Sequence, residues 1–436
     1  MDTLTSRLLL YAEDEDSILA RLSACFALWR EGQTPKAALI RAVYDQVRRL
    51  VELAAEYDLA GDVWQAYLTW LLMTDENAFT LLSERTGAAE GTVRRFAQAD
   101  LGLFRALFHY DFSAMEADLG IDCFSLLRRY APAGTSPRRC DRQVGEQICA
   151  LSAQLAQAGD DDAFFALAAA YYAACGVGRL GLSRVFRLRV RDDRPALLPV
   201  RNADTVLLRD LVGYEAQKRQ LRDNTEAFLC GRPANHVLLY GDAGTGKSTS
   251  IRALANEYHD RGLRIIELYK HQLQSLPAVM AMVKDRNYRF ILFLDDLSFE
   301  EDEVEYKFLK AVIEGGVGAM PDNVLLYASS NRRHLVRETW GDRSDMEQAG
   351  DIHRSDTQEE KLSLSARFGV RIFYGSLSFA QFRQTVLELA HRQGVTLPDE
   401  TLLARANQWE LRHSGRSGRT AQQFINAVLG AEETEE

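Results

Sequence analysis

Apolar residues recur every three or four positions through the first 185 residues of the chain. In the segment 39–54, for instance, Leu39, Val43, Val47 and Leu50 follow this spacing, which places them on one face of a helix. A stripe of this kind is typical of a helix that buries one side in the core of a bundle. We therefore expect residues 1–185 to form a helical N-terminal domain.

From residue 236 onward the pattern changes to short, wholly apolar runs separated by helical segments. Strands that are apolar on both sides are typical of a parallel sheet covered by helices on both faces. The pattern therefore predicts an α/β domain with strands at 237–240, 263–268, 290–294, 324–328 and 370–374. After residue 376 the helical pattern returns, and Ser378 with Gln381 forms a capping box. The chain is thus expected to end in a small helical domain, 376–436.

The stretch 186–210 separates these two patterns. Residues 186–190 alternate apolar side chains with arginine, and the sequence Asp-Asp-Arg-Pro at 192–195 interrupts any regular element. We expect this stretch to be a linker, so that the α/β domain covers residues 211–375.

Residues 241–248 have the sequence Gly-Asp-Ala-Gly-Thr-Gly-Lys-Ser and match the phosphate-loop pattern G-x-x-x-x-G-K-[ST] in full. The loop follows a predicted strand and precedes a predicted helix. In that context backbone amides surround phosphate oxygens, and the helix N-terminus favours their charge. Lys247 is expected to reach the β- and γ-phosphates of ATP, and Ser248 to bind Mg²⁺. The expected nucleotide contacts are Gly241, Asp242, Ala243, Gly244, Thr245, Gly246, Lys247, Ser248 and Thr249.

The apolar run 290–294 ends in two aspartates, as a Walker B strand ends in acidic residues. A carboxylate at this place lies beside the metal site, so we expect Asp295 to orient Mg²⁺ through water. Asp296 would be the base that activates the attacking water. Glutamate is the commonest residue at that second position, and aspartate is one methylene shorter. Glu300 and Glu301 are therefore alternative candidates for the base.

Three further polar residues are candidates for contact with the γ-phosphate. Asn331 follows the apolar run 324–328 and could position the attacking water. Arg367 precedes the last predicted strand, and Arg419 begins the last predicted helix. Arginine suits both places because its planar, permanently charged guanidinium binds phosphate oxygens.

In this order the motifs resemble the AAA+ ATPase module. More closely, the chain resembles a bacterial AAA+ family known as domain of unknown function 815, over a region from about residue 207 to residue 429. The most specific motifs are Leu-Asp-Asp-Leu-Ser-Phe-Glu and Asn-Arg-Arg-His-Leu. The matching stretches are 211–218, 233–240, 294–300, 330–335 and 415–421.

The resemblance implies an α/β AAA+ P-loop module preceded by an all-α N-terminal domain. Its sheet would have five parallel strands, with the phosphate loop after the central one. ATP would lie in a cleft between this sheet and a helical lid, residues 376–436, and would be hydrolysed there. The chain would assemble into a ring with copies of itself. Asn331 and Arg419 would then sense the nucleotide, and Arg367 would act as a finger on the nucleotide of a neighbouring subunit.

Composition bears on the partners and the compartment. The formal net charge of -10, from 52 basic and 62 acidic residues, disfavours a general nucleic-acid coat, which carries a basic excess. The six cysteines form no C-x-x-C pair and are expected to be free thiols. The most apolar long stretch, 163–177, is shorter than the roughly 20 residues that span a bilayer. No basic leader opens the chain, so we expect a cytoplasmic protein without a membrane partner.

Three functions fit these features. The favoured one is an ATP-driven remodeller of a protein client, which the N-terminal domain recognises. The alternatives are a nucleic-acid-associated ATPase similar to helicase loaders and a slow nucleotide-dependent switch that signals by assembly. The segment 269–273 lacks the aromatic–apolar–glycine pattern of unfoldase pore loops, which weakens a threading mechanism. The charged stretch 337–361 is predicted to be a loop insertion, either a regulator at the subunit interface or a solvated loop.

Overall fold

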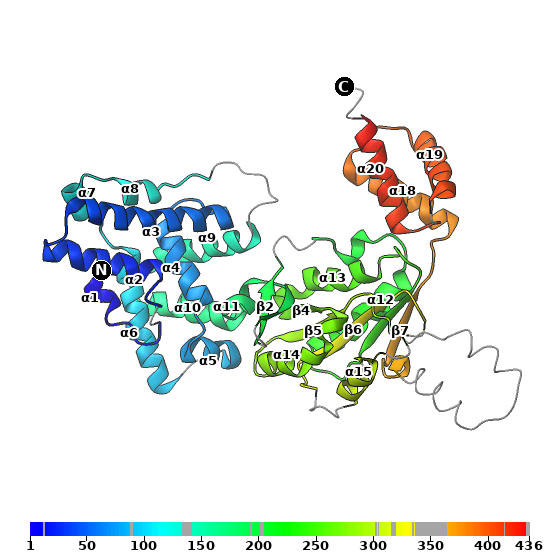
Figure 1. Cartoon of the computed structure of the whole chain (residues 1–436), viewed down its shortest axis with the longest axis horizontal. Helices are drawn as coiled ribbons and strands as arrows, with labels where there is room; N and C mark the ends of the chain where they lie inside the picture. The colour runs from blue at the N-terminus through cyan, green and yellow to red at the C-terminus, as the bar shows by residue number, and fades with distance from the viewer. Residues whose placement is uncertain are drawn as a thin grey trace, which may run out of the picture. The chain divides into compact units, whose positions relative to one another are not determined.

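The computed structural model describes residues 1–11, 14–87, 90–132, 142–191, 194–200, 205–300, 303, 305–314, 320–333, 335, 364–413 and 415–432. The chain divides into two compact units, Met1–Ser183 and Arg184–Glu436, both traced in Figure 1. Among the helices of the described residues, none has both the length and the apolar run needed to cross a bilayer.

The first unit is helical, as its apolar periodicity predicts. Its helices are α1 (Asp2–Thr5), α2 (Ile18–Glu31), α3 (Lys36–Tyr57), α4 (Val63–Thr74), α5 (Ala78–Thr86), α6 (Gly91–Phe108), α7 (Ser113–Leu119), α8 (Cys123–Leu127), α9 (Arg142–Ala156), α10 (Asp161–Cys175) and α11 (Gly178–Leu182). The predicted stripe on α3 faces inward, since Leu39, Val43 and Leu50 are buried. Apolar residues from most of these helices form one hydrophobic cluster, which is the core of this unit.

The second unit is built on a sheet of seven strands in the order β2-β1-β4-β5-β6-β3-β7. The strands are β1 (Val185–Arg191), β2 (Arg194–Pro199), β3 (Val237–Gly241), β4 (Leu263–Leu268), β5 (Arg289–Leu294), β6 (Val324–Ser330) and β7 (Val370–Tyr374). All neighbouring pairs are parallel except β1 with β2. Helices α12 (Glu215–Leu229) and α13 (Lys247–Tyr258) cover one face, and α14 (Leu276–Val283) and α15 (Glu305–Ile313) cover the other (Figure 1).

The five strands expected from the sequence are present and parallel, and their bounds differ from the prediction by at most two residues. The linker expected at 186–210 is wrong in its first half, because β1 and β2 occupy it. Phe186 and Leu188 are buried there, while Arg187 between them and Arg189 after them are exposed. Pro195 is tolerated because β2 is the edge strand of the sheet. The expectation that the phosphate loop follows the central strand is also wrong, since β3 lies one strand from the other edge.

The chain ends in a small helical lid, as predicted. It consists of α18 (Phe379–Gln393), α19 (Asp399–Arg412) and α20 (Gly418–Glu432), and apolar residues from all three helices form a cluster of their own. The predicted capping box is confirmed, because the Ser378 and Gln381 side chains each accept the backbone N–H of the other residue. The predicted insertion 337–361 lies outside the described residues.

Candidate nucleotide-binding site

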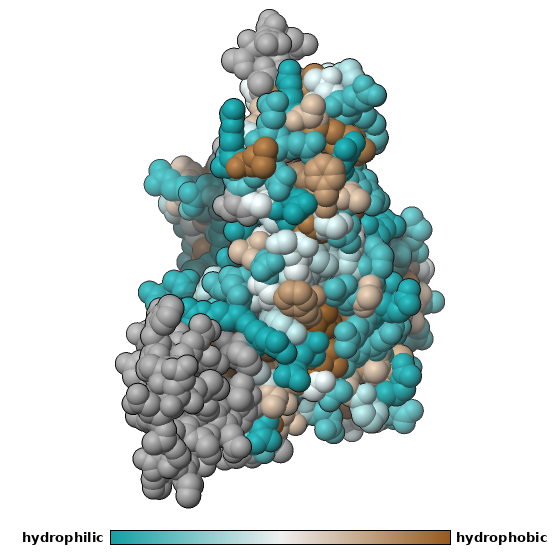
Figure 2. Space-filling view, turned by 90° about the vertical axis from the view of Figure 1, so that its right-hand side faces the viewer, coloured by the Kyte–Doolittle hydropathy of each residue, from teal (hydrophilic) through white to brown (hydrophobic). Residues whose placement is uncertain are grey.

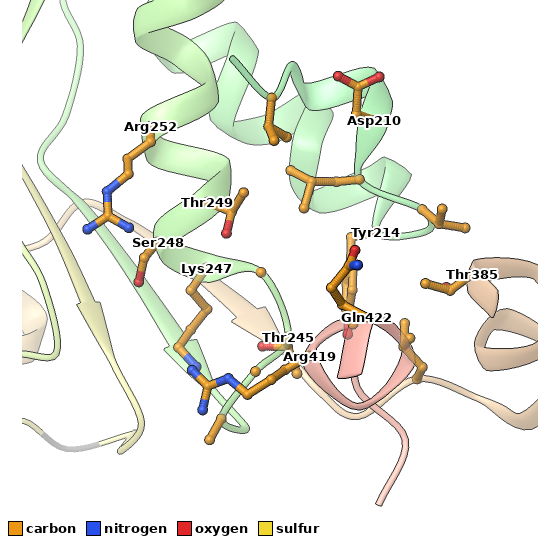
Figure 3. Close-up of a pocket in the computed structure, with 18 of the residues that line it drawn as sticks. Asp210, Tyr214, Thr245, Lys247, Ser248, Thr249, Arg252, Thr385, Arg419 and Gln422 are labelled. Atoms are coloured by element: carbon orange, nitrogen blue, oxygen red, sulfur yellow. The ribbon is translucent and has the colours of Figure 1, made fainter. Parts of the chain in front are cut away.

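Strand β3 leads into the phosphate loop and helix α13 leaves it, the context that the motif requires. Gly241 has a φ of 134°, and a Cβ at this position would lie 2.1 Å from the carbonyl oxygen of Tyr374. Only glycine therefore allows the loop to pass so close to β7. The loop borders a cleft of about 700 Å³, which residues 243–249 line and which Gly241 and Asp242 do not. Figure 3 shows this cleft with its lining side chains from the loop, α13 and the lid.

Lys247 is buried beside this cleft and braces the loop from within. Its Nζ donates to the carbonyl oxygens of Gly241 at 3.0 Å and Asp242 at 2.6 Å, and to Oδ1 of Asn331 at 2.9 Å. Burial lowers the pKa of Lys247, and the positive charge of Arg419 acts in the same direction. An anion in the cleft would oppose both effects, which makes this a favourable place for phosphate oxygens.

Ser248 and Asp295 meet at the carboxyl end of β5. Ser248 Oγ donates to Asp295 Oδ1 at 2.5 Å, and Ser329 Oγ on the adjacent β6 donates to the same oxygen at 2.6 Å. In the described part of the chain, no three His, Cys, Asp or Glu residues gather as metal ligands. One hydroxyl and one carboxylate beside a phosphate site suit Mg²⁺, which commonly takes one or two carboxylates together with phosphates and water. Ser248 and Asp295 would hold such an ion.

Asp296 and Asn331 stand side by side at the rim of the same cleft. Asn331 Nδ2 donates to Asp296 Oδ1 at 2.9 Å, and the Asp296 N–H donates to Ser329 Oγ at 3.0 Å. Asp296 has a φ of 52°, in the left-handed region that a non-glycine residue rarely adopts and that is over-represented at functional sites. Of the two alternative bases, Glu300 does not line the cleft and Glu301 falls outside the described residues. The structure therefore brings Asp296, and not Glu300, beside Asn331.

The two candidate arginines have different surroundings. Arg419 lies in the first turn of α20 and lines the cleft. Its backbone N–H donates to the carbonyl oxygen of Gly244 at 3.2 Å. Figure 3 shows its side chain extending from the lid toward the phosphate loop. Arg367 does not line the cleft. Its side chain is 45% exposed, and the guanidinium pairs with Glu314 at 2.6 Å. Only Arg419 thus reaches the loop of its own chain.

Several residues of the cleft carry no motif and were not singled out from the sequence. Arg252 is the clearest case, because its Nη2 donates to Asp295 Oδ2 at 3.0 Å. Its only signal is its spacing four residues after Ser248, which puts both on one face of α13. The cleft is also lined by apolar and aromatic side chains outside the loop, which suit a base ring. They are Val206, Leu211, Val212, Tyr214, Leu377 and Leu389.

Known proteins resemble parts of this chain. The replication factor C large subunit of Staphylothermus marinus is 32% identical over 97 residues, which are 22% of this chain and 22% of that protein. The chain therefore matches about a fifth of the length of this relative. Two solved structures are more distant. The Thermotoga maritima RuvB Holliday junction branch migration motor is 14% identical, covers 51% of this chain and 71% of its own, and gives a TM-score of 0.32.

The second structure is the FIGL-1 AAA domain in complex with ADP. It is 19% identical, covers 52% of this chain and 73% of its own, and gives a TM-score of 0.36. A family model, in contrast, matches residues 183–432, more than half of the 436 residues. The chain therefore belongs to the family described as protein of unknown function (DUF815), and the matched part contains the phosphate loop, the strands and the lid described above.

Proposed function

We propose that this chain hydrolyses ATP to ADP and phosphate in the cleft, with Mg²⁺ as its cofactor. The observation that carries the proposal is that one cleft gathers the phosphate loop, the acidic end of β5, Asn331 of the next strand and Arg419 of the lid. These groups come from four separate parts of the sequence. A purely structural role for each would not require them to share one cavity.

Each of these groups has a task in the proposed reaction. Lys247 exchanges its contacts with loop carbonyls for contacts with phosphate oxygens, and Arg419 adds positive charge from the lid. Asp296 and Asn331 orient a water molecule. Its oxygen bonds to the γ-phosphorus while the bond from phosphorus to the bridging oxygen of ADP breaks, and Asp296 accepts the proton. Mg²⁺, when bound at Ser248 and Asp295, supplies charge neutralisation for the phosphate oxygens.

The first experiment tests the site through Lys247. Replacing Lys247 with alanine should weaken ATP binding roughly 10- to 100-fold, the cost of a lost charged hydrogen bond. Isothermal titration calorimetry measures the affinity, and phosphate release measures turnover. Lys307→Ala is the control, because Lys307 is exposed on α15 and does not line the cleft. Equal ATP affinity in the Lys247 variant and the control would refute this assignment.

We further propose that the site is completed by a second copy of the chain, as part of a ring. Arg367 has the charge for a finger but does not line the cleft of its own chain. Strand β7, which begins three residues after Arg367, is an edge of the sheet. Figure 2 looks onto the side of the molecule that carries β7 and the lid, and apolar patches interrupt its hydrophilic surface. Phe373 on β7 and Phe379 at the start of α18 are 52% and 43% exposed, which favours contact with another subunit.

The proposed use of hydrolysis is the remodelling of a protein partner, which the helical unit would bind. Two features support a partner-binding role for the helical unit. The family model begins at residue 183, so the helical unit lies outside the matched module. Leu9, Tyr44 and Leu126 of that unit are 57%, 47% and 63% exposed, which suits contact with another protein. A partner that co-purifies with the ATP-bound, hydrolysis-deficient Asp296→Asn protein and leaves on addition of ADP would support this use.

A nucleic-acid-associated ATPase is the second candidate, and one surface feature favours it. A groove of about 460 Å³ is lined by Arg261, Lys284, Arg286 and Arg289, with Asp322 as its acidic residue. The resemblance to a replication factor C subunit points the same way. If this groove contacts phosphates, duplex DNA should bind with an affinity that falls steeply with salt. The Arg286→Glu variant should then bind more weakly and with a smaller salt slope. Absence of binding at low salt would dismiss this candidate.

A further inference from the structure

A chain of alternating charges runs from the carboxylate of the metal site to strand β1. Arg252 lies between two carboxylates: its Nη2 donates to Asp295 Oδ2 at 3.0 Å, and its Nε donates to Glu267 Oε1 at 2.7 Å. The other oxygen of Glu267 accepts a hydrogen bond from Arg187 Nε at 3.0 Å. Arg187 on β1 is the direct register partner of Glu267 on β4. Four elements, β1, β4, α13 and β5, therefore meet through side-chain charges.

Because Glu267 is buried, this row of charged side chains can fix the position of Asp295. The side chain of Glu267 is only 10% exposed, whereas those of Arg252 and Arg187 are 35% and 52% exposed. A buried carboxylate requires close partners because desolvation penalises its charge. Each oxygen of Glu267 has one arginine, so the carboxylate is fixed on both sides. The planar fork of Arg252 then sets the position of Asp295 relative to this fixed point.

We propose that Arg252 is a positioning residue for the Mg²⁺ site, and that Arg187 acts with it through Glu267. Arg252 engages Oδ2 of Asp295, while Oδ1 accepts hydrogen bonds from Ser329 and from Ser248, the other residue that would hold the ion. The inference rests on the proposed function, because the orientation of Asp295 matters only where Mg²⁺-nucleotide binds. Strand β1 begins at Val185, directly after the helical unit in the chain. The strand next to the helical unit in sequence thereby supports the metal site.

A competing role for Arg252 is that of a cation that opposes Mg²⁺ binding to Asp295. The two roles predict different results for the same variants. Lysine keeps the positive charge but cannot bridge two carboxylates with a planar fork. If Arg252 positions Asp295, Arg252→Lys and Arg252→Gln both weaken Mg²⁺ binding. If Arg252 competes with the ion, Arg252→Gln strengthens Mg²⁺ binding and Arg252→Lys resembles the wild type.

The test is the Mg²⁺ dependence of ADP binding to the full chain, measured by calorimetry without any turnover. In Arg252→Gln and Arg252→Lys, the Mg²⁺ concentration of half-maximal effect should rise roughly tenfold, as when groups that orient metal ligands are lost. ADP affinity in the presence of EDTA should not change. Arg187→Gln should give a smaller rise than either Arg252 variant, below tenfold. Arg189→Gln is the matched control, because Arg189 is exposed on the same strand two residues away.

The double variant Arg187→Gln/Arg252→Gln should match Arg252→Gln alone, because Arg187 acts through Arg252. Independent, additive effects of the two substitutions would overturn the inference, as would a lower Mg²⁺ requirement in Arg252→Gln. Arg187 is half-exposed, so its variant decides the question even if the Arg252 variants fail to fold. Wild-type protein that binds ADP without any Mg²⁺ effect and releases no phosphate from ATP would instead refute the proposed function. If only the inference fails, the wild-type protein still shows a Mg²⁺ effect on ADP binding and still releases phosphate from ATP.

Discussion

Asp100 in the helical unit and Asp295 in the α/β unit are both carboxylates that accept several hydrogen bonds, but their donors differ in kind. Asp100 is 1% exposed and accepts the backbone N–H groups of residues 9–11 at 2.7 to 3.2 Å. Asp295 accepts side-chain donors, among them Ser248 and Arg252, and its own side chain is 34% exposed beside the cleft. Backbone donors cannot leave a carboxylate without local unfolding, whereas side-chain donors can rotate.

Other charged groups follow the same division. In the helical unit, Glu116 accepts the backbone N–H groups of Phe124 and Ser125 at 2.8 and 2.9 Å, which ties the start of α8 to α7. In the α/β unit, Lys247 donates to loop carbonyls and to Asn331, contacts that a phosphate could replace. Buried charges in the first unit therefore serve stability, while those at the cleft remain available to a ligand. Substitutions of buried charges in the helical unit should therefore lower stability, whereas substitutions at the cleft should lower nucleotide binding or turnover.

The largest expected effect concerns Arg367, since an arginine finger contributes about 10³- to 10⁵-fold in rate. Arg367→Ala should lower turnover by roughly 10³-fold while ATP affinity stays the same, because Arg367 does not line the cleft of its own chain. Mixing Arg367→Ala with Lys247→Ala should restore activity, because the two chains can build one intact site between them. Phosphate release across a dilution series measures both effects, and activity per chain should rise with concentration.

Arg371→Ala is the control for this experiment, because Arg371 is exposed on β7 four residues after Arg367. A mixture that stays inactive, together with activity per chain that is constant down to the monomer, would show that Arg367 acts within its own chain or only in the ion pair with Glu314.

A substitution at Asp296 should distinguish ATP binding from ATP hydrolysis in the α/β unit. Asp296→Asn removes the proton acceptor but keeps the size and the contact with Asn331, so ATP should still bind. Turnover should fall by roughly 10²-fold or more, the usual contribution of a general base. Phosphate release and calorimetry on the same preparation measure the two quantities. Glu300→Gln is the matched control, and loss of turnover in that variant instead would identify Glu300 as the base.

The sequence alone predicts the part of this site that lies on successive parallel strands. Wholly apolar runs indicate buried strands, and the carboxyl ends of adjacent parallel strands must meet at one edge of a sheet. The neighbourhood of Asp295, Asp296 and Asn331 follows from that geometry. The phosphate loop is equally predictable from the sequence, because its glycines and lysine have fixed spacing and its conformation depends mainly on local residues.

The remainder depends on contacts between distant elements, which no local pattern records. The partners of Arg252 come from β4 and β5, and neither pairing has a sequence motif. Strand β1 was mistaken for linker because its outward arginines obscure the alternation of Phe186 and Leu188. The apolar end of the cleft combines residues such as Val206, Tyr214 and Leu389, which only the packed lid brings together.

In the helical unit, replacing Asp100 with asparagine should cost stability and leave the nucleotide site unaffected. The variant keeps the shape but loses the charge that several backbone N–H groups share, at a cost of about 3 kcal/mol for charge-assisted hydrogen bonds in a buried place. Urea denaturation followed by tryptophan fluorescence measures the loss. Asp45→Asn, exposed on α3, is the control and should change stability by less than about 0.5 kcal/mol. Weaker ATP binding in Asp100→Asn under native conditions would contradict the separation of roles.

The smallest effect is a difference in how the two units respond to acid. Burial lowers the pKa of His236, which precedes β3, to about 4 from its ordinary value of 6.5. Between these values the unfolded chain binds the proton and the folded chain does not, so stability is lost as pH falls from 6.5 toward 4. Burial raises the pKa of Asp75, which follows α4 in the helical unit, to about 6 from 3.8. Here the folded chain binds the proton first, so stability is gained as pH falls from 6 toward 3.8.

Two single substitutions isolate these opposing contributions. Asp75→Asn should stabilise the protein at pH 7 by about 2 kcal/mol, and the gain should vanish toward pH 4. His236→Gln keeps an acceptor for the Leu326 N–H that His236 Nδ1 now binds at 3.1 Å. Its gain relative to the wild type should be absent at pH 7 and grow to about 2 kcal/mol near pH 4. Urea denaturation of both variants and the wild type at several pH values measures the two trends. If the differences from the wild type change in the same direction with pH, the half-buried Asp75 and His236 do not give the two units opposite responses to acid.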